Sequence, residues 1–385
     1  MKYNSLLVYY FMFFLMNGFS TFVPKYYGEI GLTDGMIGIL TSVPTIVAVA
    51  CSPMIAVLTD RVPKKRYMLT VLLALLSLSC FLIAPCRSMG ALLLTVSLHV
   101  AVFNGILPLS NAISLEYTRE IGKSHGRVRL MGTVGYQVGA LVAGAIMAKS
   151  LNNLYQFMGV ILIITVGITF VMPNVKGHQH ANKEKVPLSK LFADKHVRWM
   201  YGMLFFATVS TQFYMAFFTK HLGDLGMSNS VVSWVTLLSV IMELPFLYFG
   251  DRIAKKTNVW NWILIGLAIN SVRWIGLAYS KSVVPILLFQ LPSVCVLACY
   301  EYFPALYLNR KVPEELSGSA QNMLALMMFG VAKVVGTLLG GQICERIGIP
   351  AMFLINGIMG LIGVAVFWPI TRKLIRKDTV LSLVN

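Results

Sequence analysis

Charged side chains are scarce in this sequence, and acidic ones are the scarcest. Asp, Glu, Lys and Arg supply 12% of the 385 residues, whereas globular domains carry about 25%. A chain with so little charge and 57% hydrophobic residues cannot cover a water-exposed globular surface, and no segment could hold a separate enzyme domain. The six cysteines are scattered and form no metal-binding cluster. We therefore expect a membrane protein that is not an enzyme and that holds neither a metal ion nor a cofactor.

Long apolar runs make up most of the chain. Runs of about 20 apolar residues are typical of transmembrane helices, whereas transmembrane barrels show short alternating segments. We predict an all-α membrane protein with twelve transmembrane helices. Their predicted ranges are 5–25, 35–58, 67–86, 90–115, 128–149, 153–173, 197–219, 229–249, 259–280, 282–308, 317–343 and 349–371.

The longest polar stretch divides the chain near its middle. We predict a six-helix bundle over residues 1–174, a cytoplasmic connecting loop over 175–196, and a second six-helix bundle over 197–385 that ends in a short basic cytoplasmic tail. Most of the 32 Lys and Arg fall in loops on one side of the predicted membrane, and positive charge marks the cytoplasmic side. Both termini are therefore expected in the cytoplasm, and the net charge of +17 indicates topology instead of a nucleic-acid partner.

The two halves of the sequence repeat each other. Four residues of the first half recur in the second half 191 or 192 positions later. A shared offset in separate motifs indicates two bundles related as parallel repeats, an arrangement that alternating-access transporters use. The pairs are Pro53 and Pro245, Asp60 and Asp251, Gly126 and Gly318, and Gly144 and Gly336.

Two short basic turns carry a resemblance to a known family. Residues 60–65 read D-R-V-P-K-K after the second predicted helix, and residues 251–256 read D-R-I-A-K-K after the eighth. The pattern resembles the inner loops of the major facilitator superfamily, and the resemblance extends over essentially the whole chain. Residues 126–132 also resemble the entry to the fifth helix of lactose-permease-like and phenylpropionate-permease-like proton symporters. The resemblance implies two bundles that open alternately to the two sides of the membrane.

The basic turns and two neighbouring segments are predicted to form a cytoplasmic gate. Asp60 and Asp251 sit at helix ends, where they can pair with basic residues of adjacent inner loops and hold that side closed. Glu116 is near enough in sequence to pair with Arg127 or Arg129. The alternative is that these charges only enforce topology or form an interfacial salt bridge. The predicted gate residues are Asp60, Arg61, Lys64, Lys65, Glu116, Arg127, Arg129, Asp251 and Arg252.

Four ionisable residues inside predicted helices of the second half are candidates for proton coupling. A charge in the bilayer costs about 2.5–3.5 kcal/mol on insertion scales, so such residues are functional candidates. Glu243, Arg273, Glu301 and Lys333 fall in the eighth to eleventh helices. The set is similar to lactose-permease-like symporters, which carry acids on helices eight and ten and an Arg on helix nine. The favoured proton carrier is Glu301, just before Pro304, where a kink can admit water. The alternative is a static ion-pair network.

Polar residues elsewhere in the predicted helices are candidates for lining a solute cavity. Asn104 and Asn111 are seven residues apart, so two helical turns place them on one face. A single amide can equally well serve as a hydrogen-bonding contact between helices, and this alternative stays open. The predicted cavity residues are Asn17, His99, Asn104, Asn111, Gln137, Gln212 and Asn322.

Together these features predict a monomeric secondary transporter of the plasma (inner) membrane. Its expected partners are the lipid bilayer, a proton and a small organic solute such as a sugar, nucleoside or aromatic acid, imported by symport. Ala298 stands where the sugar permeases have a His, which disfavours lactose itself. A proton-coupled efflux antiporter and a non-transporting membrane sensor are the alternatives, and uptake measurements distinguish them.

Overall fold

A computed structural model describes residues 2–62, 64–147, 151–173, 192–243, 245–246 and 258–376. These residues form helices joined by short connections, and no strand occurs among them. Their contacts divide the chain into two compact units. Unit 1 comprises Met1–Lys183 and Leu222–Ser233, and unit 2 comprises Glu184–His221 and Trp234–Asn385. The predicted loop at 175–196 falls largely outside the described residues.

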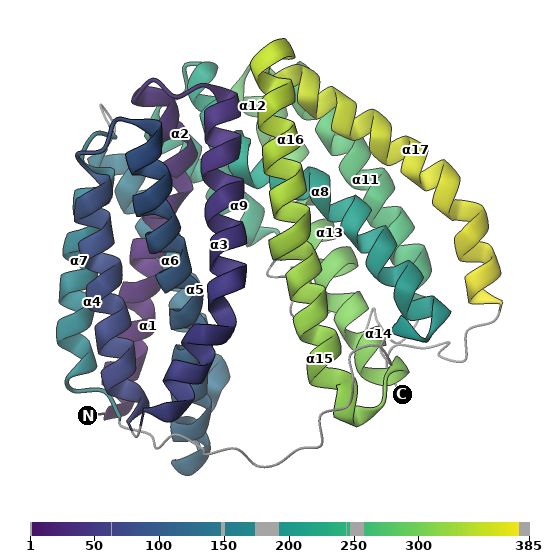
Figure 1. The fold of residues 1–385 in the computed structure, drawn as a ribbon. Coiled ribbons are helices and arrows are strands. Elements are labelled where there is room, and N and C mark those ends of the chain that lie inside the picture. The colour runs from purple at the N-terminus through teal and green to yellow at the C-terminus, as the bar shows by residue number, and fades with distance from the viewer. Residues whose placement is uncertain are drawn as a thin grey trace. The chain divides into compact units, whose positions relative to one another are not determined.

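Unit 1 is a bundle of long helices (Figure 1). Several of them begin at a side-chain cap, as α5 and α6 do at Ser88 and Ser124, whose hydroxyls accept backbone N–H groups that the first turn leaves unpaired. Figure 1 shows α1 and α6 side by side, and α4 packs against both α5 and α7. The helices are α1 (Lys2–Phe19), continued by η1 (Ser20–Phe22) and α2 (Val23–Glu29), then α3 (Asp34–Arg61), α4 (Lys65–Ile83), α5 (Met89–Glu120), α6 (His125–Ile146) and α7 (Leu154–Thr169).

Unit 2 contains helices with more internal breaks. The helix α11 packs against α17 along its length (Figure 1). The elements are α8 (Lys195–Asp224), α9 (Asn229–Ile241), α11 (Val259–Tyr279), α12 (Val283–Gln290), η3 (Leu291–Ser293), α13 (Val294–Val296), η4 (Leu297–Tyr302), α14 (Phe303–Lys311), α15 (Glu314–Ala325), η5 (Leu326–Val331), α16 (Ala332–Ile347) and α17 (Ile349–Ile375). The first residues of α9 and the end of α8 belong to unit 1.

Eight helices among the described residues are long and apolar enough to cross a membrane. Two shorter apolar helices, Leu154–Thr169 and Asn229–Ile241, accompany them. A bilayer core is about 30 Å thick and requires about 20 apolar residues. The molecule is therefore an all-helical integral membrane protein, as the apolar runs of the sequence predict.

The predicted helix at 282–308 is a continuous helical segment, Val283–Lys311, that changes its winding four times. A 3₁₀ turn surrounds Pro292, and the π-helical turn η4 precedes Pro304, which stands in the first turn of α14. Proline lacks an N–H donor, so the preceding turn must adjust its hydrogen bonding. π-Helical turns recur at functional sites, and this one contains Glu301.

Candidate functional site

The guanidinium of Arg273 lies at the centre of a polar cluster in unit 2. Arg273 is 2% exposed on α11. Its Nε donates to the Phe289 carbonyl at 3.0 Å and its Nη2 to Gln290 Oε1 at 2.5 Å. The rings of Tyr214 and Trp274 lie 4.5 and 4.7 Å from the guanidinium carbon. Carbonyl dipoles and aromatic faces therefore stabilise this buried cation.

Gln290 connects three further elements to Arg273. Its Oε1 accepts from Tyr214 Oη and from Ser239 Oγ, each at 3.0 Å, as well as from Arg273. Ser293 Oγ donates to the Ser239 carbonyl at 3.0 Å. The Gln290 Oε1 atom thus links four helices, namely α8, α9, α11 and α12. Gln290 is fully buried, and its Nε2 has no partner among the described residues.

Two carboxyl groups stand near this cluster. Glu243 follows the end of α9, and Glu301 lies in the π-helical turn η4. Glu243 interacts electrostatically with both Glu301 and Arg273. Within the described part of the chain, however, neither acid forms an ion pair with Arg273 or Lys333. The structure therefore brings three of the four predicted charges into electrostatic range, and neutral groups make the direct contacts to Arg273.

The polar residues predicted to line the cavity come from both units, and those of unit 1 mostly bond to neighbouring side chains. Tyr10 Oη donates to Asn111 Oδ1 at 2.9 Å, and the neighbouring Tyr9 bonds to Ser110 at 2.6 Å. His99 Nδ1 bonds to Ser79 Oγ at 2.8 Å. Asn17 Oδ1 accepts from Ser20, Asn104 and Asn322 are exposed, Gln137 is half-buried, and Gln212 is buried. Tyr10, which orients Asn111, was not predicted as a site residue.

Among the described residues of the predicted cytoplasmic gate, the structure shows a partly buried ion pair. Lys65 Nζ lies 3.4 Å from Glu116 Oε2, and Lys65 is 8% exposed. Arg127 and Arg129 are exposed, and Lys64 lies over the ring of Tyr67. The side chains of Asp60 and Arg61, together with Asp251 and Arg252, lie outside the described residues, so their gating role stays a prediction.

A second contact, absent from the sequence predictions, holds the segment Leu222–Ser233 in unit 1. Lys25 Nζ donates to Asn229 Oδ1 at 2.6 Å, and Asn229 Nδ2 donates to the Met147 carbonyl at 2.5 Å. Ser233 Oγ donates to the Ala140 carbonyl at 2.7 Å. We name this set of contacts the outer clasp, because the predicted topology places these helix ends on the outer side of the membrane. It joins α2 and the C-terminal part of α6 to residues from the second half of the sequence.

Glycines of α6 explain why two different elements can approach it. A Cβ at Gly135 or Gly139 would overlap the backbone carbonyls of Phe11 and Leu15 on α1. A Cβ at Gly144 would instead overlap Ser233 Oγ and lie 2.7 Å from the Asn229 carbonyl. Small residues let membrane helices approach closely; in α6 most of this close packing is against α1, and the Gly144 contact belongs to the outer clasp.

Comparisons with known proteins agree with this architecture. The sequence profile of the MFS_1 like family matches residues 3–355. The uncharacterized transporter YwbF of Bacillus subtilis is 24% identical over 86% of this chain and 84% of its own length. The maltose permease of Geobacillus stearothermophilus is 21% identical over 95% of this chain and 94% of its own.

A solved structure shows the same fold. The crystal structure of the nucleoside transporter NupG superposes with a TM-score of 0.84 at 18% identity, over 95% of this chain and 98% of that one. The predicted relation to the lactose-permease-like and phenylpropionate-permease-like proteins is confirmed by matches to both kinds of permease. The chain belongs to the MFS_1 like family, and it is a membrane transporter of the major facilitator type rather than an enzyme.

Proposed function

We propose that the protein is a proton-coupled symporter that imports a small organic solute by alternating access. The observation that carries the proposal is the interaction of Glu243 with both Glu301 and the buried Arg273. A proton bound to either acid removes the repulsion between the two carboxylates and changes the field at Arg273. Because neutral groups hold Arg273, its charge remains available to a polar or anionic solute. Proton and solute binding are then linked at one place.

The solute classes follow from the polar groups and from the relatives. Gln290 and Arg273 offer hydrogen-bond donors, and Tyr214 and Trp274 offer aromatic faces. Such a combination suits a sugar, a nucleoside or an aromatic acid. A maltose permease and a nucleoside transporter are among the proteins that this chain resembles. This supports a small polar organic solute as cargo.

The same proposal includes twelve membrane-spanning helices, arranged as two six-helix bundles in the inner membrane. Both termini lie in the cytoplasm, and the protein works as a monomer. The helix order supports it, because elements recur at a nearly constant spacing. The helix α11 begins 194 residues after α4, from Lys65 to Val259, and α12 begins 194 residues after α5, from Met89 to Val283. The domain boundaries at 174 and 197 stay part of the proposal.

Two sets of contacts fit the gates that alternating access requires. The outer clasp ties Leu222–Ser233 to α2 and α6 of unit 1. The predicted cytoplasmic gate contains the Lys65–Glu116 pair. In the proposed cycle the outer clasp is formed while the cytoplasmic side is open, and it breaks when the outer side opens. Only interactions that differ between the two states can drive such a shift.

Transport by purified protein in proteoliposomes tests the coupling. In Glu301→Gln the side chain mimics the protonated acid permanently, so uptake driven by a pH gradient is lost. Exchange of labelled solute across the membrane continues, because exchange requires no deprotonation. Loss of folding would abolish both activities, and the comparison therefore separates coupling from stability.

Glu345→Gln is the matched control, because Glu345 is an exposed acid at the end of α16. This variant keeps both activities. If both Glu301→Gln and Glu243→Gln retain uphill uptake, the two acids are structural and proton coupling through them is wrong. Expulsion of solute against its gradient by wild-type protein would indicate an antiporter instead.

A further inference from the structure

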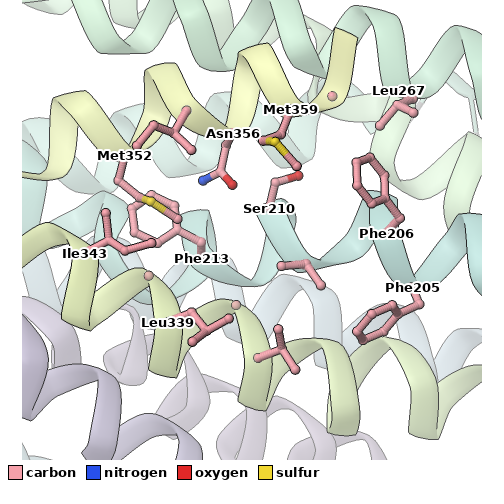
Figure 2. A pocket seen from close by; sticks show the side chains of 16 residues that line it. Phe205, Phe206, Ser210, Phe213, Leu267, Leu339, Ile343, Met352, Asn356 and Met359 are labelled. Atoms are coloured by element: carbon pink, nitrogen blue, oxygen red, sulfur yellow. The ribbon is translucent and has the colours of Figure 1, made fainter. Parts of the chain in front are cut away.

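A cavity of about 280 Å³ lies inside unit 2, between α8, α11, α16 and α17 (Figure 2). None of the residues of the Arg273 cluster lines it. Of the sixteen residues that line it, Ser210 and Asn356 are polar, and the others are apolar, aromatic or glycine. A site without charge or several convergent polar groups does not suit a sugar or a nucleoside. Its chemistry points to an apolar molecule.

Close helix crossings create the cavity. On one side α16 approaches α8 so tightly that a Cβ at Gly336 would overlap the Val209 carbonyl, and one at Gly340 would lie 2.5 Å from the Phe213 ring. On the other side α17 approaches α11 at Gly360, where a Cβ would overlap Ser271 Oγ. The glycines of these crossings line the cavity, and larger side chains such as Phe206 complete its walls. The cavity thus lies among helices that approach one another closely at these glycines.

Asn356 points its amide into this apolar space. The side chain is 8% exposed, and Figure 2 shows its amide beside Met352 and Met359, facing the cavity. The Nδ2 group has no hydrogen-bond partner among the described residues. Ser210 already donates its hydroxyl to the Ala207 carbonyl at 3.1 Å. A buried donor without an acceptor is costly, and a bound molecule that carries an acceptor removes that cost.

The walls and rim of the cavity indicate where such a molecule comes from. Helices α11 and α17 and the segment Ser319–Ile347 are all candidate membrane spans. At the rim, Leu339 is 55% and Met359 is 46% exposed. Exposed apolar side chains on helices that can cross a membrane suit hydrocarbon better than water, which favours lipid at the edge of the cavity. Its volume is near the lower limit of small-molecule sites, about 300 Å³, and therefore accepts a chain segment instead of a whole lipid.

The depth of Asn356 suits a lipid carbonyl. The 27 residues of α17 span about 40 Å, whereas the hydrocarbon core is about 30 Å thick. Asn356 is the eighth residue of α17, about 10 Å from the start of the helix. With the helix centred in the bilayer, the Asn356 backbone lies about 5 Å inside the edge of the hydrocarbon core, close to the glycerolipid ester groups at that edge. We propose that this cavity binds an acyl chain of a membrane glycerolipid whose ester carbonyl accepts a hydrogen bond from Asn356 Nδ2.

Ester and ether lipids test this hydrogen bond, because they differ in the carbonyl. Full-length protein is reconstituted with phosphatidylcholine that carries a photoreactive diazirine near the start of one chain, linked by an ester or by an ether. After illumination, mass spectrometry measures labelling of peptides that contain Met352 and Met359. In wild-type protein the ester lipid labels these peptides about two- to tenfold more than the ether lipid, the effect of one hydrogen bond.

Asn356→Leu keeps the side-chain volume and removes the donor, so ester and ether lipids label it equally. Asn261→Leu is the control, because Asn261 is exposed on α11 outside the cavity, and it retains the wild-type preference. Equal labelling of wild-type protein by the two lipids, or labelling confined to peptides outside the cavity, overturns the proposal. Loss of labelling when maltose or a nucleoside is added also overturns it, because the cavity would then belong to the solute path.

Discussion

Gly144 offers a direct test of the outer clasp. In Gly144→Ala the added methyl overlaps Ser233 Oγ and lies 2.7 Å from the Asn229 carbonyl. The serine hydroxyl can rotate, but the Asn229 carbonyl is backbone and cannot move without the whole segment. We therefore expect Leu222–Ser233 to withdraw from α6, and the population to shift toward the state in which the outer side is open.

The change in the ratio of open to closed molecules follows from the hydrogen bonds that the withdrawal weakens. Withdrawal weakens the bond from Ser233 Oγ to the Ala140 carbonyl and that from Asn229 Nδ2 to the Met147 carbonyl. Two such bonds contribute about 1–3 kcal/mol in total. The ratio of open to closed molecules then rises about 5- to 150-fold. Loss of the charge-assisted bond from Lys25 to Asn229 would increase the effect.

Thiol labelling measures this ratio. Met147 is 2% exposed, and its carbonyl is part of the clasp, so Met147→Cys reports opening through its reaction rate with an impermeant maleimide. Peptide mass spectrometry distinguishes this thiol from the native cysteines. Gly167→Ala is the control, because a Cβ at Gly167 on α7 meets nothing within 4 Å. Wild-type labelling rates in Gly144→Ala, or a slower rate, would refute the assignment of this contact as a gate.

Two further predictions concern single side chains. Arg273→Lys loses the paired bonds to the Phe289 carbonyl and Gln290 and the aromatic stacking, because an ammonium cannot reproduce a planar fork. Solute affinity of the folded variant in a binding assay therefore falls, and unchanged affinity would remove Arg273 from the site. His125 stands at the start of α6, where burial, and to a smaller extent the charge of Arg129, lower the pKa of its imidazole. Protonation of His125 is therefore less favourable in the folded state than in the unfolded state. The folded state loses stability as the pH falls below about 6.5, the ordinary pKa of histidine. Unfolding midpoints of wild type should therefore drop relative to His125→Gln in acid, whereas parallel curves would contradict this.

The helices were predictable because hydropathy and length alone determine which segments can cross a membrane. The predicted run 153–173 corresponds to α7 at Leu154–Thr169, and 67–86 corresponds to α4 at Lys65–Ile83. Changes of winding were harder to predict, since hydropathy carries no information on hydrogen-bond register. Pro304 did indicate a disturbance near Glu301, and the structure has a π-helical turn there.

The partners of Arg273 were not predictable from spacing. Residues on one helix can be assigned to a face, but contacts between helices depend on how the helices pack. Charge balance favoured an acid as the partner, yet the structure provides Gln290 and the Phe289 carbonyl, with Tyr214 and Trp274 stacked alongside. A buried guanidinium requires directed acceptors more than a net opposite charge. Amides and backbone carbonyls meet that requirement, and they carry no signal that distinguishes them in a hydrophobic sequence.

The glycines of α6 also have contact partners that the sequence does not identify and that the structure does. A glycine in an apolar run indicates that another backbone comes close, but it does not identify that backbone. Gly135 and Gly139 meet α1, which precedes α6 in the same half of the chain, whereas Gly144 meets a segment from the other half. The first contact is compatible with a permanent bundle. The second joins sequence halves that alternating access requires to separate, so a methyl group at Gly144 should change the conformational equilibrium while one at Gly135 should unfold the bundle.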